Sequence, residues 1–499
     1  MGRITGISSP VYMHRLEPLC DCRLMRAAVL LLATISCAAA DLEHRIGALL
    51  EQSPALAHAF VGVSVIDLTN GKALYRRNDD QLLLPASNMK VLTTSLALTR
   101  LGPEAHFETR IVLSPSGDLV LIGSGDPSLS GRVYPYDKTT PAGPPLQAIE
   151  ALADEAIARG LARVEGDIIG DDRLYPWEPY APGWTIDDAQ HEYGAPVSAL
   201  TINDNTLALI VHPGVAAGEP PAISFQPPLE YYSIDNRATT IGRGEAQLRI
   251  SRLERSRQLA VWGSIAVNQP QRELIPIDDP ALYAAQALYD ALIRRGVFVR
   301  GKPVARHRLV EEDYDPPEGT EVARRESPPM LDLLRVVDKV SQNLHAELML
   351  REVGRVTRHS ATRDAGLHEM MTMLGEAGVA SDGARLEDGS GLSRSVIVTP
   401  RAMTRVLAHM YASKFRAAFV SLLPVAGEDG TLAHRFEDVK DAGSIQAKTG
   451  SLGRALALSG YASAKNGTPL AFSILVNNFA APSSDVRHAI DKIASSLLE

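Results

Sequence analysis

Two runs of apolar residues near the N-terminus predict a β-hairpin, and the pattern that follows predicts a helix. Residues 60–66 (FVGVSVI) are rich in Val and Ile, and an Asn-Gly pair separates them from a second short run at residues 73–76. An Asn-Gly pair between two such runs is typical of a tight hairpin turn. Over residues 87–101, apolar side chains recur at helical spacing until a Gly-Pro pair interrupts them. We therefore expect a hairpin followed by a helix.

The C-terminal part repeats this style of patterning. Three runs predict strands at residues 444–448, 456–462 and 470–477, and apolar residues sharing one face predict a last helix over 484–498. The N-terminal hairpin and these three strands can complete one antiparallel sheet, with helices packed on its faces. The sequence therefore predicts an α+β domain assembled from both ends of the chain.

The middle of the chain has a different texture. Residues 105–307 are rich in Pro, Gly and short β-like runs, and clear helical spacing occurs there at 147–159 and 281–295. We interpret this stretch as one or two mainly β domains inserted into the first domain. Residues 41–104 and 308–499 then form the first domain, and we expect the insertion to supply no nucleophile or general base.

The first 40 residues predict an export signal. Two arginines precede an apolar stretch over residues 27–37, and three alanines that end at residue 40 form a small-residue cleavage site. Met25 is our preferred start for this signal, because the residues before it make an irregular leader. Cys37 as a lipid attachment site is the alternative. The apolar stretch is too short for a permanent membrane span, so we expect a periplasmic product without an integral membrane segment.

Composition argues against several classes of function. All three cysteines fall within residues 1–40, so the mature chain has neither a thiol nucleophile nor a cysteine metal site. The net charge of −9 argues against a nucleic-acid partner. The sequence contains no HExxH metal helix and no GxSxG nucleophile turn. We therefore expect no metal and no cofactor, and we interpret His345 and His434 as packing or surface residues.

Three short motifs occur in order along the chain. Residues 87–90 (SNMK) fit SxxK, residues 341–343 (SQN) fit SxN, and residues 448–450 (KTG) follow in the C-terminal part. On a helix, residues i and i+3 are neighbours, so Lys90 is expected beside Ser87. A serine hydroxyl needs a base to become a nucleophile, and a lysine is a base only when burial or a second cation lowers its pKa. The lysine of KTG is our candidate for that cation.

The KTG motif has the composition of an anion-binding strand end. A strand is expected to end at Lys448, and the glycine of the motif leaves room for a ligand beside it. A cation together with the hydroxyls of Thr449 and Ser451 suits a substrate carboxylate. The backbone N–H groups of Ser87 and Ser451 are candidates for an oxyanion hole.

As a set, the three motifs resemble the active-site signature of penicillin-binding proteins and serine β-lactamases. The long stretch between SxxK and SxN resembles the class C low-molecular-mass group, the penicillin-binding protein 4 type D-alanyl-D-alanine carboxypeptidase/endopeptidases. Four further stretches are similar to that family: residues 123–129, 181–184, 388–392 and 423–431. The resemblance covers essentially the whole mature chain. It implies a penicillin-recognising serine transpeptidase/β-lactamase-like fold with a large insertion.

The resemblance also implies a role for each motif residue. Ser87 corresponds to the acylated nucleophile and Lys90 to its general base. Ser341 corresponds to the group that relays a proton to the leaving amine, and Asn343 to the group that holds the substrate amide. The middle residue of this SxN motif is Gln342, where the β-lactamase version has aspartate.

The implied substrates are peptidoglycan stem peptides that end in, or are cross-linked through, D-alanine, and the implied inhibitors are β-lactams. Lys448, Thr449 and Ser451 correspond to the site of the terminal carboxylate. An acid of the inserted region faces the cationic end of the peptide stem in this family, and Asp171 is our candidate for it.

Two rival hypotheses remain open. A β-lactamase would share the acylation step, but its fast deacylation needs a second base over the ester, and no glutamate occurs in the ExxLN context of class A enzymes. A non-catalytic peptidoglycan-binding protein would keep the fold, although a pure binder has no need of Lys90.

Overall fold

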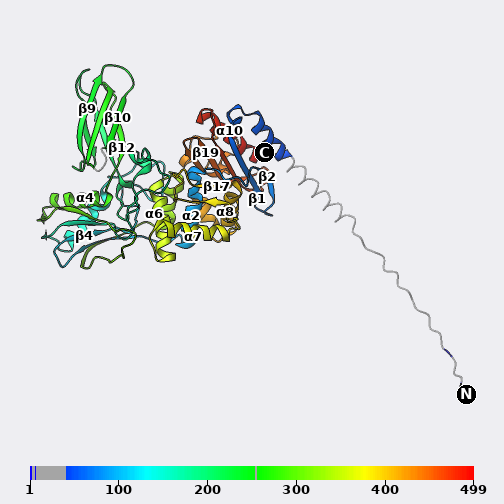
Figure 1. The fold of residues 1–499 in the computed structure, drawn as a ribbon, viewed down its shortest axis with the longest axis horizontal. Helices are drawn as coiled ribbons and strands as arrows, with labels where there is room; N and C mark the ends of the chain where they lie inside the picture. The colour runs from blue at the N-terminus through cyan, green and yellow to red at the C-terminus, as the bar shows by residue number, and fades with distance from the viewer. Residues whose placement is uncertain (3–5, 7–40, 253–255) are drawn as a thin grey trace.

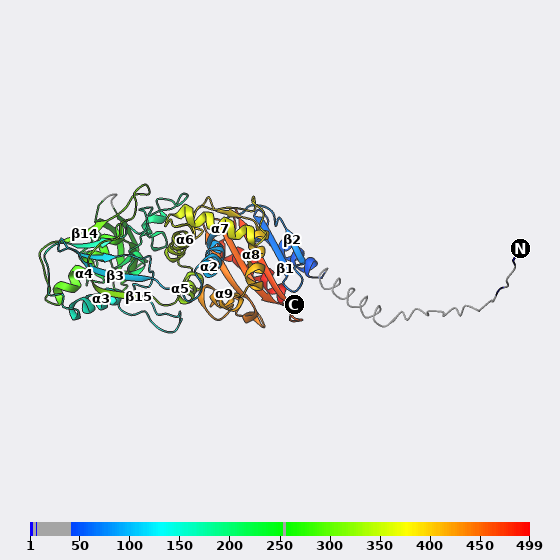
Figure 2. The same ribbon diagram turned by 90° about the horizontal axis from the view of Figure 1, so that it is seen from below.

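A computed structural model of the chain describes residues 1, 2, 6, 41–252 and 256–499. The predicted export signal falls almost entirely outside these described residues. Two parts of the molecule lie side by side along its longest axis (Figures 1 and 2). One part contains both ends of the described chain from residue 41 onward, and the other is built from its middle.

The first part is organised around one antiparallel sheet, as the sequence predicts. Its five strands lie in the order β18-β19-β20-β1-β2, so strands from the two ends of the chain pair directly. The strands are β1 (Phe60–Asp67), β2 (Ala73–Arg77), β18 (Gln446–Leu452), β19 (Ala455–Ser463) and β20 (Pro469–Asn477).

Alternate residues of these strands enter two separate hydrophobic cores, because successive side chains of a strand point to opposite faces. Ala457 and Tyr461 of β19 join one core, whereas Leu456 and Leu458 join the other. The first core is covered by α2 (Met89–Arg100), α5 (Met330–Lys339), α6 (Asn343–Arg358), α7 (Arg363–Glu376), α8 (Pro400–Ala412) and α9 (Arg416–Leu422). The second is covered by a helix over residues 41–52 and by α10 (Ser483–Ser495).

The inserted part begins with a second five-stranded sheet, ordered β14-β6-β4-β3-β15. Its strands are β3 (Glu108–Leu113), β4 (Leu119–Ile122), β6 (Ile168–Asp171), β14 (Pro303–Arg306) and β15 (Thr320–Glu326), with helices α3 (Gln147–Ala158) and α4 (Pro280–Arg294) beside it. The last strand, β15, pairs antiparallel with β3 along most of its length. We therefore propose that the inserted region continues past residue 307 to Glu326.

Two three-stranded sheets form a projection from the inserted part, at the upper left of Figure 1. One has the order β10-β11-β9 and the other β12-β7-β8. Their strands are β7 (Thr206–His212), β8 (Ala222–Gln226), β9 (Ser233–Ile241), β10 (Gln247–Arg252), β11 (Gln258–Ala266) and β12 (Gln271–Pro276). Apolar residues of both sheets join the core of the inserted part. With these strands the inserted region is mainly β, as expected from its composition.

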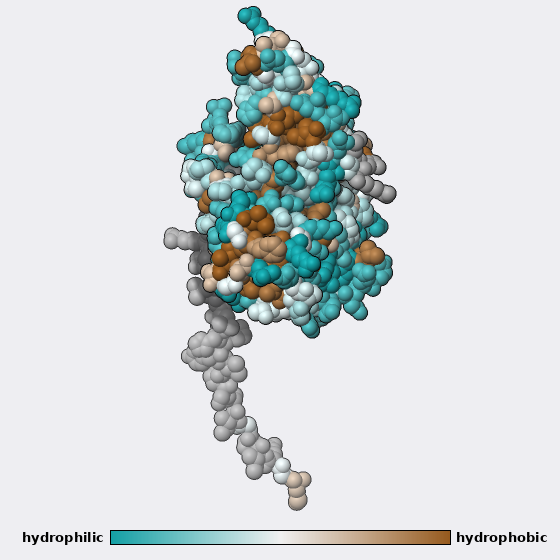
Figure 3. Space-filling model, turned by 90° about the vertical axis from the view of Figure 1, so that its left-hand side faces the viewer, coloured by the Kyte–Doolittle hydropathy of each residue, from teal (hydrophilic) through white to brown (hydrophobic). Residues whose placement is uncertain are grey.

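The outer end of the inserted part is mostly hydrophilic. Figure 3 looks onto this end, where hydrophobic side chains form separate patches among polar ones. Within the described residues, no helix is both long enough and apolar enough to cross a membrane.

Two element boundaries differ from the sequence prediction near the motifs. The predicted helix start at Ser87 is a 3₁₀ turn, η2 (Ala86–Asn88), and α2 begins at Met89. The predicted strand at 444–448 is wrong in its bounds, because Ala442–Ser444 form a 3₁₀ turn and β18 runs on to Leu452. The KTG motif therefore lies within a strand.

Candidate active site

Residues of SxxK and SxN, together with Ser451 directly after KTG, line one cavity of about 360 Å³ between the two parts of the chain. Ser87 contributes from η2, Ser341 and Asn343 from the junction of α5 and α6, and Ser451 from β18. Leu452 and Gly453 follow Ser451 at the end of β18. The other lining residues come from the inserted part and from the loop after β16 (Ala384–Arg385): Asp188, Tyr193, Gly391, Leu392 and Arg394. Sequence positions more than 350 residues apart thus surround one space.

Lys90 lies directly beside the Ser87 hydroxyl. Its Nζ is 3.0 Å from Ser87 Oγ, and it also donates to Asn343 Oδ1 at 2.6 Å and to the Ser390 carbonyl at 2.7 Å. The side chain is completely buried, and among the described residues no carboxylate forms an ion pair with it. Burial, reinforced by the charge of Lys448, holds the pKa of Lys90 well below its usual range. A neutral amine at this position can accept the serine proton.

The SxN motif occupies a sharp corner between α5 and α6. Ser341 has φ 64°, a left-handed conformation that costs a non-glycine residue about 1–3 kcal/mol. This corner places Ser341 Oγ 2.8 Å from Lys448 Nζ. Asn343 bridges two parts of the site, because its Oδ1 accepts from Lys90 and its Nδ2 donates to the Tyr193 carbonyl at 2.8 Å.

The KTG motif lies on β18, which is an edge strand of the central sheet. Lys448 is fully buried, and burial lowers its pKa, an effect that the carboxylate of Asp338 opposes. The Ala447 N–H donates to the Pro424 carbonyl across the open edge at 2.9 Å. Because backbone N–H groups alternate in direction along a strand, Thr449 and Ser451 direct their N–H groups to the same edge. The Thr449 hydroxyl lies 2.8 Å from that of Thr431, beside an adjoining cavity of about 350 Å³.

Two buried carboxylates fix the loop that carries Ser390. Glu347 Oε1 accepts the N–H groups of Gly389 and Ser390, both at 2.9 Å. Asp388 accepts the N–H of Gly391 at 2.8 Å and the indole N–H of Trp184 at 2.9 Å. These bonds hold the Ser390 carbonyl where it accepts from Lys90. The sequence marks this loop only as a stretch similar to the family, without a role for its residues.

Gly391 of this loop passes against the turn that carries Ser87. A Cβ on Gly391 would lie 1.9 Å from the Ala86 carbonyl oxygen, and its φ of 78° is left-handed. Both constraints favour glycine at this position.

The acid of the inserted part that lines the cavity is Asp188, and the structure does not bring Asp171 there. Asp171 ends β6, is buried, and pairs with Arg173 at 2.7 Å. Asp188 lies in a 3₁₀ turn, accepts the Thr185 N–H at 2.7 Å, and pairs with Arg394 across the cavity wall. No local pattern in the sequence marks Asp188, because Arg394 lies 206 positions away.

The two histidines have the surroundings expected for packing and surface residues. His345 is fully buried, and its Nε2 lies 2.9 Å from Asp204 Oδ1. His434 is exposed and lies near Glu437.

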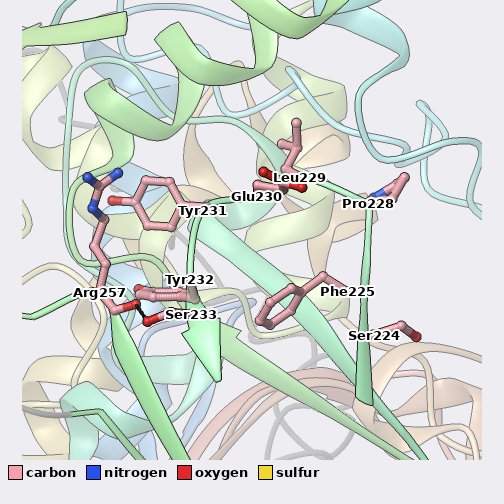
Figure 4. Close-up of a pocket in the computed structure, with 9 residues that line it drawn as sticks. All are labelled: Ser224, Phe225, Pro228, Leu229, Glu230, Tyr231, Tyr232, Ser233 and Arg257. Carbon is pink, nitrogen blue, oxygen red and sulfur yellow. Dashed lines mark hydrogen bonds between the residues drawn. The ribbon is translucent and has the colours of Figure 1, made fainter. Parts of the chain in front are cut away.

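A larger cavity of about 680 Å³ lies at the base of the projection, away from the three motifs. Figure 4 shows Phe225, Tyr231 and Tyr232 around it, with Arg257 beside Tyr231. The two tyrosines are only 3% and 6% exposed, and their hydroxyls are held by Asp278. The residues that line this cavity include no pair of nucleophile and base comparable to Ser87 and Lys90, so we place the candidate active site at the smaller one.

Comparison with known proteins agrees with this geometry. Residues 42–497 match the D-Ala-D-Ala carboxypeptidase 3 (S13) family. The chain belongs to this family. It is therefore a serine-type hydrolase of the penicillin-recognising class, as the motifs indicate. The D-alanyl-D-alanine carboxypeptidase of Actinomadura sp. (strain R39) is 33% identical over 461 residues, which are 89% of this chain and 82% of that protein.

A further relative has the same activity in its name, and a solved structure shares the fold. The D-alanyl-D-alanine carboxypeptidase DacB of Haemophilus influenzae is 24% identical over 84% of this chain and 86% of its own length. The crystal structure of penicillin binding protein 4 (dacB) from Haemophilus influenzae matches with a TM-score of 0.77 at 23% identity, covering 91% of this chain and 98% of that one. The predicted penicillin-recognising α+β fold with a large insertion is confirmed.

Proposed function

We propose that this S13 family member hydrolyses D-alanyl-D-alanine bonds of peptidoglycan stem peptides through an acyl-enzyme on Ser87. The observation that carries this proposal is the position of Lys90, fully buried and with its Nζ 3.0 Å from Ser87 Oγ. A buried lysine without a carboxylate partner among the described residues is disposed to be neutral, and neutral lysine is a base.

Acylation begins when Lys90 takes the Ser87 proton and Oγ attacks the carbonyl carbon of the penultimate D-alanine. Negative charge then develops on the carbonyl oxygen, where the N–H groups of Ser87 and Ser451 stabilise it. The terminal carboxylate of the substrate binds at Lys448, Thr449 and Ser451, because a cation with two hydroxyls matches a carboxylate.

Ser341 completes the step by protonating the leaving amine. Lys448 donates to Ser341 Oγ at 2.8 Å, so the hydroxyl hydrogen of Ser341 is free to point toward the substrate. As the C–N bond breaks, this hydrogen passes to the amine, and a proton from Lys448 replaces it. The proton that Lys90 took from Ser87 then passes to Lys448, which restores the charge of Lys448 and leaves Lys90 neutral. Water then attacks the ester, with Lys90 acting again as the base.

β-Lactams enter the same path, because their strained amide and carboxylate match the groups that the site binds. A structure of penicillin binding protein 4 from Haemophilus influenzae, which shares the fold, is a complex with a β-lactam. Opening of the lactam leaves the amine tethered to the adduct, which we expect to hydrolyse slowly. The endopeptidase reaction, which cleaves cross-links, breaks the same type of bond, the peptide bond that follows D-alanine.

Asp188 takes the role that the sequence suggested for Asp171. Its carboxylate lines the Ser87 cavity from the inserted part, and its charge suits the cationic end of a peptide stem. Arg394 beside it fixes the carboxylate and suits an anionic neighbour on the same stem.

With the signal-like N-terminus, we place the enzyme in the periplasm, where such stems occur.

Incubation of purified muropeptides with the enzyme tests this function. Pentapeptide stems should lose their terminal D-alanine, and cross-linked dimers should separate into monomers. A protein that binds muropeptides without releasing D-alanine or monomers is the non-catalytic alternative. Rapid turnover of benzylpenicillin with no action on muropeptides is the β-lactamase alternative.

A further inference from the structure

A buried carboxylate that the proposed reaction does not use lies behind the active-site lysines. Asp338 is on α5, three residues before Ser341, and its side chain is fully buried. Its Oδ2 lies 2.9 Å from Thr94 Oγ1, whereas its Oδ1 has no hydrogen-bond partner among the described residues. Such a group is costly to bury, so its presence beside the catalytic motifs calls for a physical explanation.

The other charged groups around this point already have partners. Lys339 of α5 pairs with Asp429 at 2.6 Å, and Glu347 of α6 accepts from the loop of Ser390 and pairs with Arg351 at 3.2 Å. Asp388 is bonded to backbone N–H groups of its own loop.

Lys448 on β18 and Lys90 on α2 donate only to uncharged oxygens among the described residues. Asp338 is the carboxylate whose charge opposes the effect of burial on Lys448. Asp338 is therefore a negative charge that acts on both lysines, although it forms a hydrogen bond with neither of them.

Thr94 provides a hydrogen-bond arrangement for either protonation state of Asp338. Its hydroxyl carries one hydrogen and lies 2.8 Å from the Lys90 carbonyl and 2.9 Å from Asp338 Oδ2. When Asp338 is ionised, Thr94 donates to the carboxylate. When Asp338 is protonated, the carboxyl can donate to Thr94 Oγ1 while Thr94 donates to the Lys90 carbonyl. The site thus accommodates the gain and loss of one buried proton.

We propose that Asp338 is a positioning residue whose negative charge keeps Lys448 protonated at the upper end of the working pH range. Burial raises the pKa of Asp338, against the opposing charges of Lys448 and Lys90. Asp338 therefore becomes charged as the pH rises toward the range in which Lys448 would otherwise lose its proton. Lys448 then stays a cation that binds the substrate carboxylate and orients Ser341.

This inference rests on the proposed function, and it predicts a larger effect on one limb of the pH profile than on the other. Loss of the Lys448 proton should limit activity at high pH, whereas protonation of Lys90 should limit activity at low pH. Removal of the Asp338 charge should therefore move the basic limb to lower pH. The acidic limb should move less, because the charge of Asp338 raises the pKa of Lys90 less than the charges of Asp388 and Glu347 do.

The test is the acylation rate of the full-length mature enzyme by benzylpenicillin as a function of pH. Asp338→Asn keeps the shape of the side chain and its bond to Thr94 but removes the charge. It should be acylated at neutral pH, with its basic limb about one pH unit below that of the wild type. Asp332→Asn, on the same helix, is the matched control and should leave both limbs unchanged.

Each outcome decides a different question. A basic limb at the wild-type position in Asp338→Asn, or an equal shift in Asp332→Asn, would overturn the role of Asp338. If Asp338→Asn does not fold, Asp338→Ser offers a smaller neutral side chain with the same expected shift. Failure of the wild-type enzyme to be acylated at any pH would refute the proposed function itself, before the Asp338 comparison is made.

Discussion

Lys448 Nζ lies 2.8 Å from Ser341 Oγ, so the strand lysine donates a hydrogen bond to the serine of SxN. Lys90, by contrast, lies against Ser87 and donates its other bonds to uncharged oxygens. The two buried lysines therefore have different partners and, in our account, different duties. Lys448 is a cation when the substrate binds, and Lys90 works as a neutral base.

Substitution of Lys90 should remove the base. We expect Lys90→Ala to reduce the acylation rate by roughly 10²–10⁴-fold, the usual contribution of general-base catalysis. Lys90→Arg should not recover activity, because guanidinium stays protonated. The measurement is the rate of acylation by benzylpenicillin under single-turnover conditions. Wild-type activity in Lys90→Arg would contradict the assignment.

Lys448 should tolerate arginine better than alanine. A carboxylate needs a cation, and arginine supplies one, so Lys448→Arg should retain more activity than Lys448→Ala on a carboxylate-bearing substrate. Loss of the Lys448 charge also removes one cause of the low pKa of Lys90. The acidic limb of the acylation profile should therefore move to higher pH in Lys448→Ala.

The comparison needs both a β-lactam and a peptide substrate, measured across the pH range. Equal losses for the two Lys448 variants would leave the carboxylate role without support. A crystal structure of Lys448→Arg would show whether the longer side chain fits.

Asp188 should affect the peptide substrate and not the antibiotic. Asp188→Asn removes the charge that we assign to the cationic end of the stem. We expect kcat/KM for a stem peptide with a free side-chain amine to fall by about tenfold, with benzylpenicillin acylation nearly unchanged. Asp171→Asn is the comparison variant, since Asp171 lies away from the cavity, bound to Arg173. Similar losses for both variants would argue against a specific role for Asp188.

His307 should link the stability of the inserted part to pH. Its burial disfavours the imidazolium, but hydrogen bonds to Asp172 at 2.9 Å and Asp279 at 3.4 Å raise the pKa of His307 to about 10. A raised pKa in the folded state stabilises the protein fully below the unfolded value near 6.5, and this contribution is lost as the pH rises toward 10.

His307→Gln should therefore unfold more easily than the wild type at pH 6, by on the order of 1 kcal/mol. The difference should shrink steadily between pH 6.5 and pH 10. Denaturant unfolding at several pH values measures it, and a difference that does not change with pH would refute the ion-pair explanation.

The sequence was sufficient to predict the antiparallel sheet and the contact between Ser87 and Lys90. Apolar runs at both ends of the chain predicted the strands that pair as β1 and β20, because their side chains alternate between two cores. The spacing of Ser87 and Lys90 predicted their contact, because three residues make nearly one helical turn.

Tertiary contacts explain what the sequence did not reveal. Asp188 reaches the cavity through a turn whose partner, Arg394, lies in the other part of the chain. Asp338 was missed because an aspartate suggests exposure, although its spacing from Leu334 places it on the buried face of α5, where it packs against α2 and Thr94. The start of β18 was missed because Asp441, with φ 58°, leads into a 3₁₀ turn before the strand.

The most direct test of the account is intact-mass spectrometry after incubation with benzylpenicillin, followed by peptide mapping of the adduct. Wild-type enzyme should carry one long-lived penicilloyl group on Ser87, and Ser87→Ala should carry none. Ser95→Ala is the matched control, because Ser95 is a buried serine of α2 that bonds the Val91 carbonyl and has no lysine beside its hydroxyl. This variant should be acylated like the wild type. An adduct that persists in Ser87→Ala would contradict the central claim that Ser87 is the nucleophile.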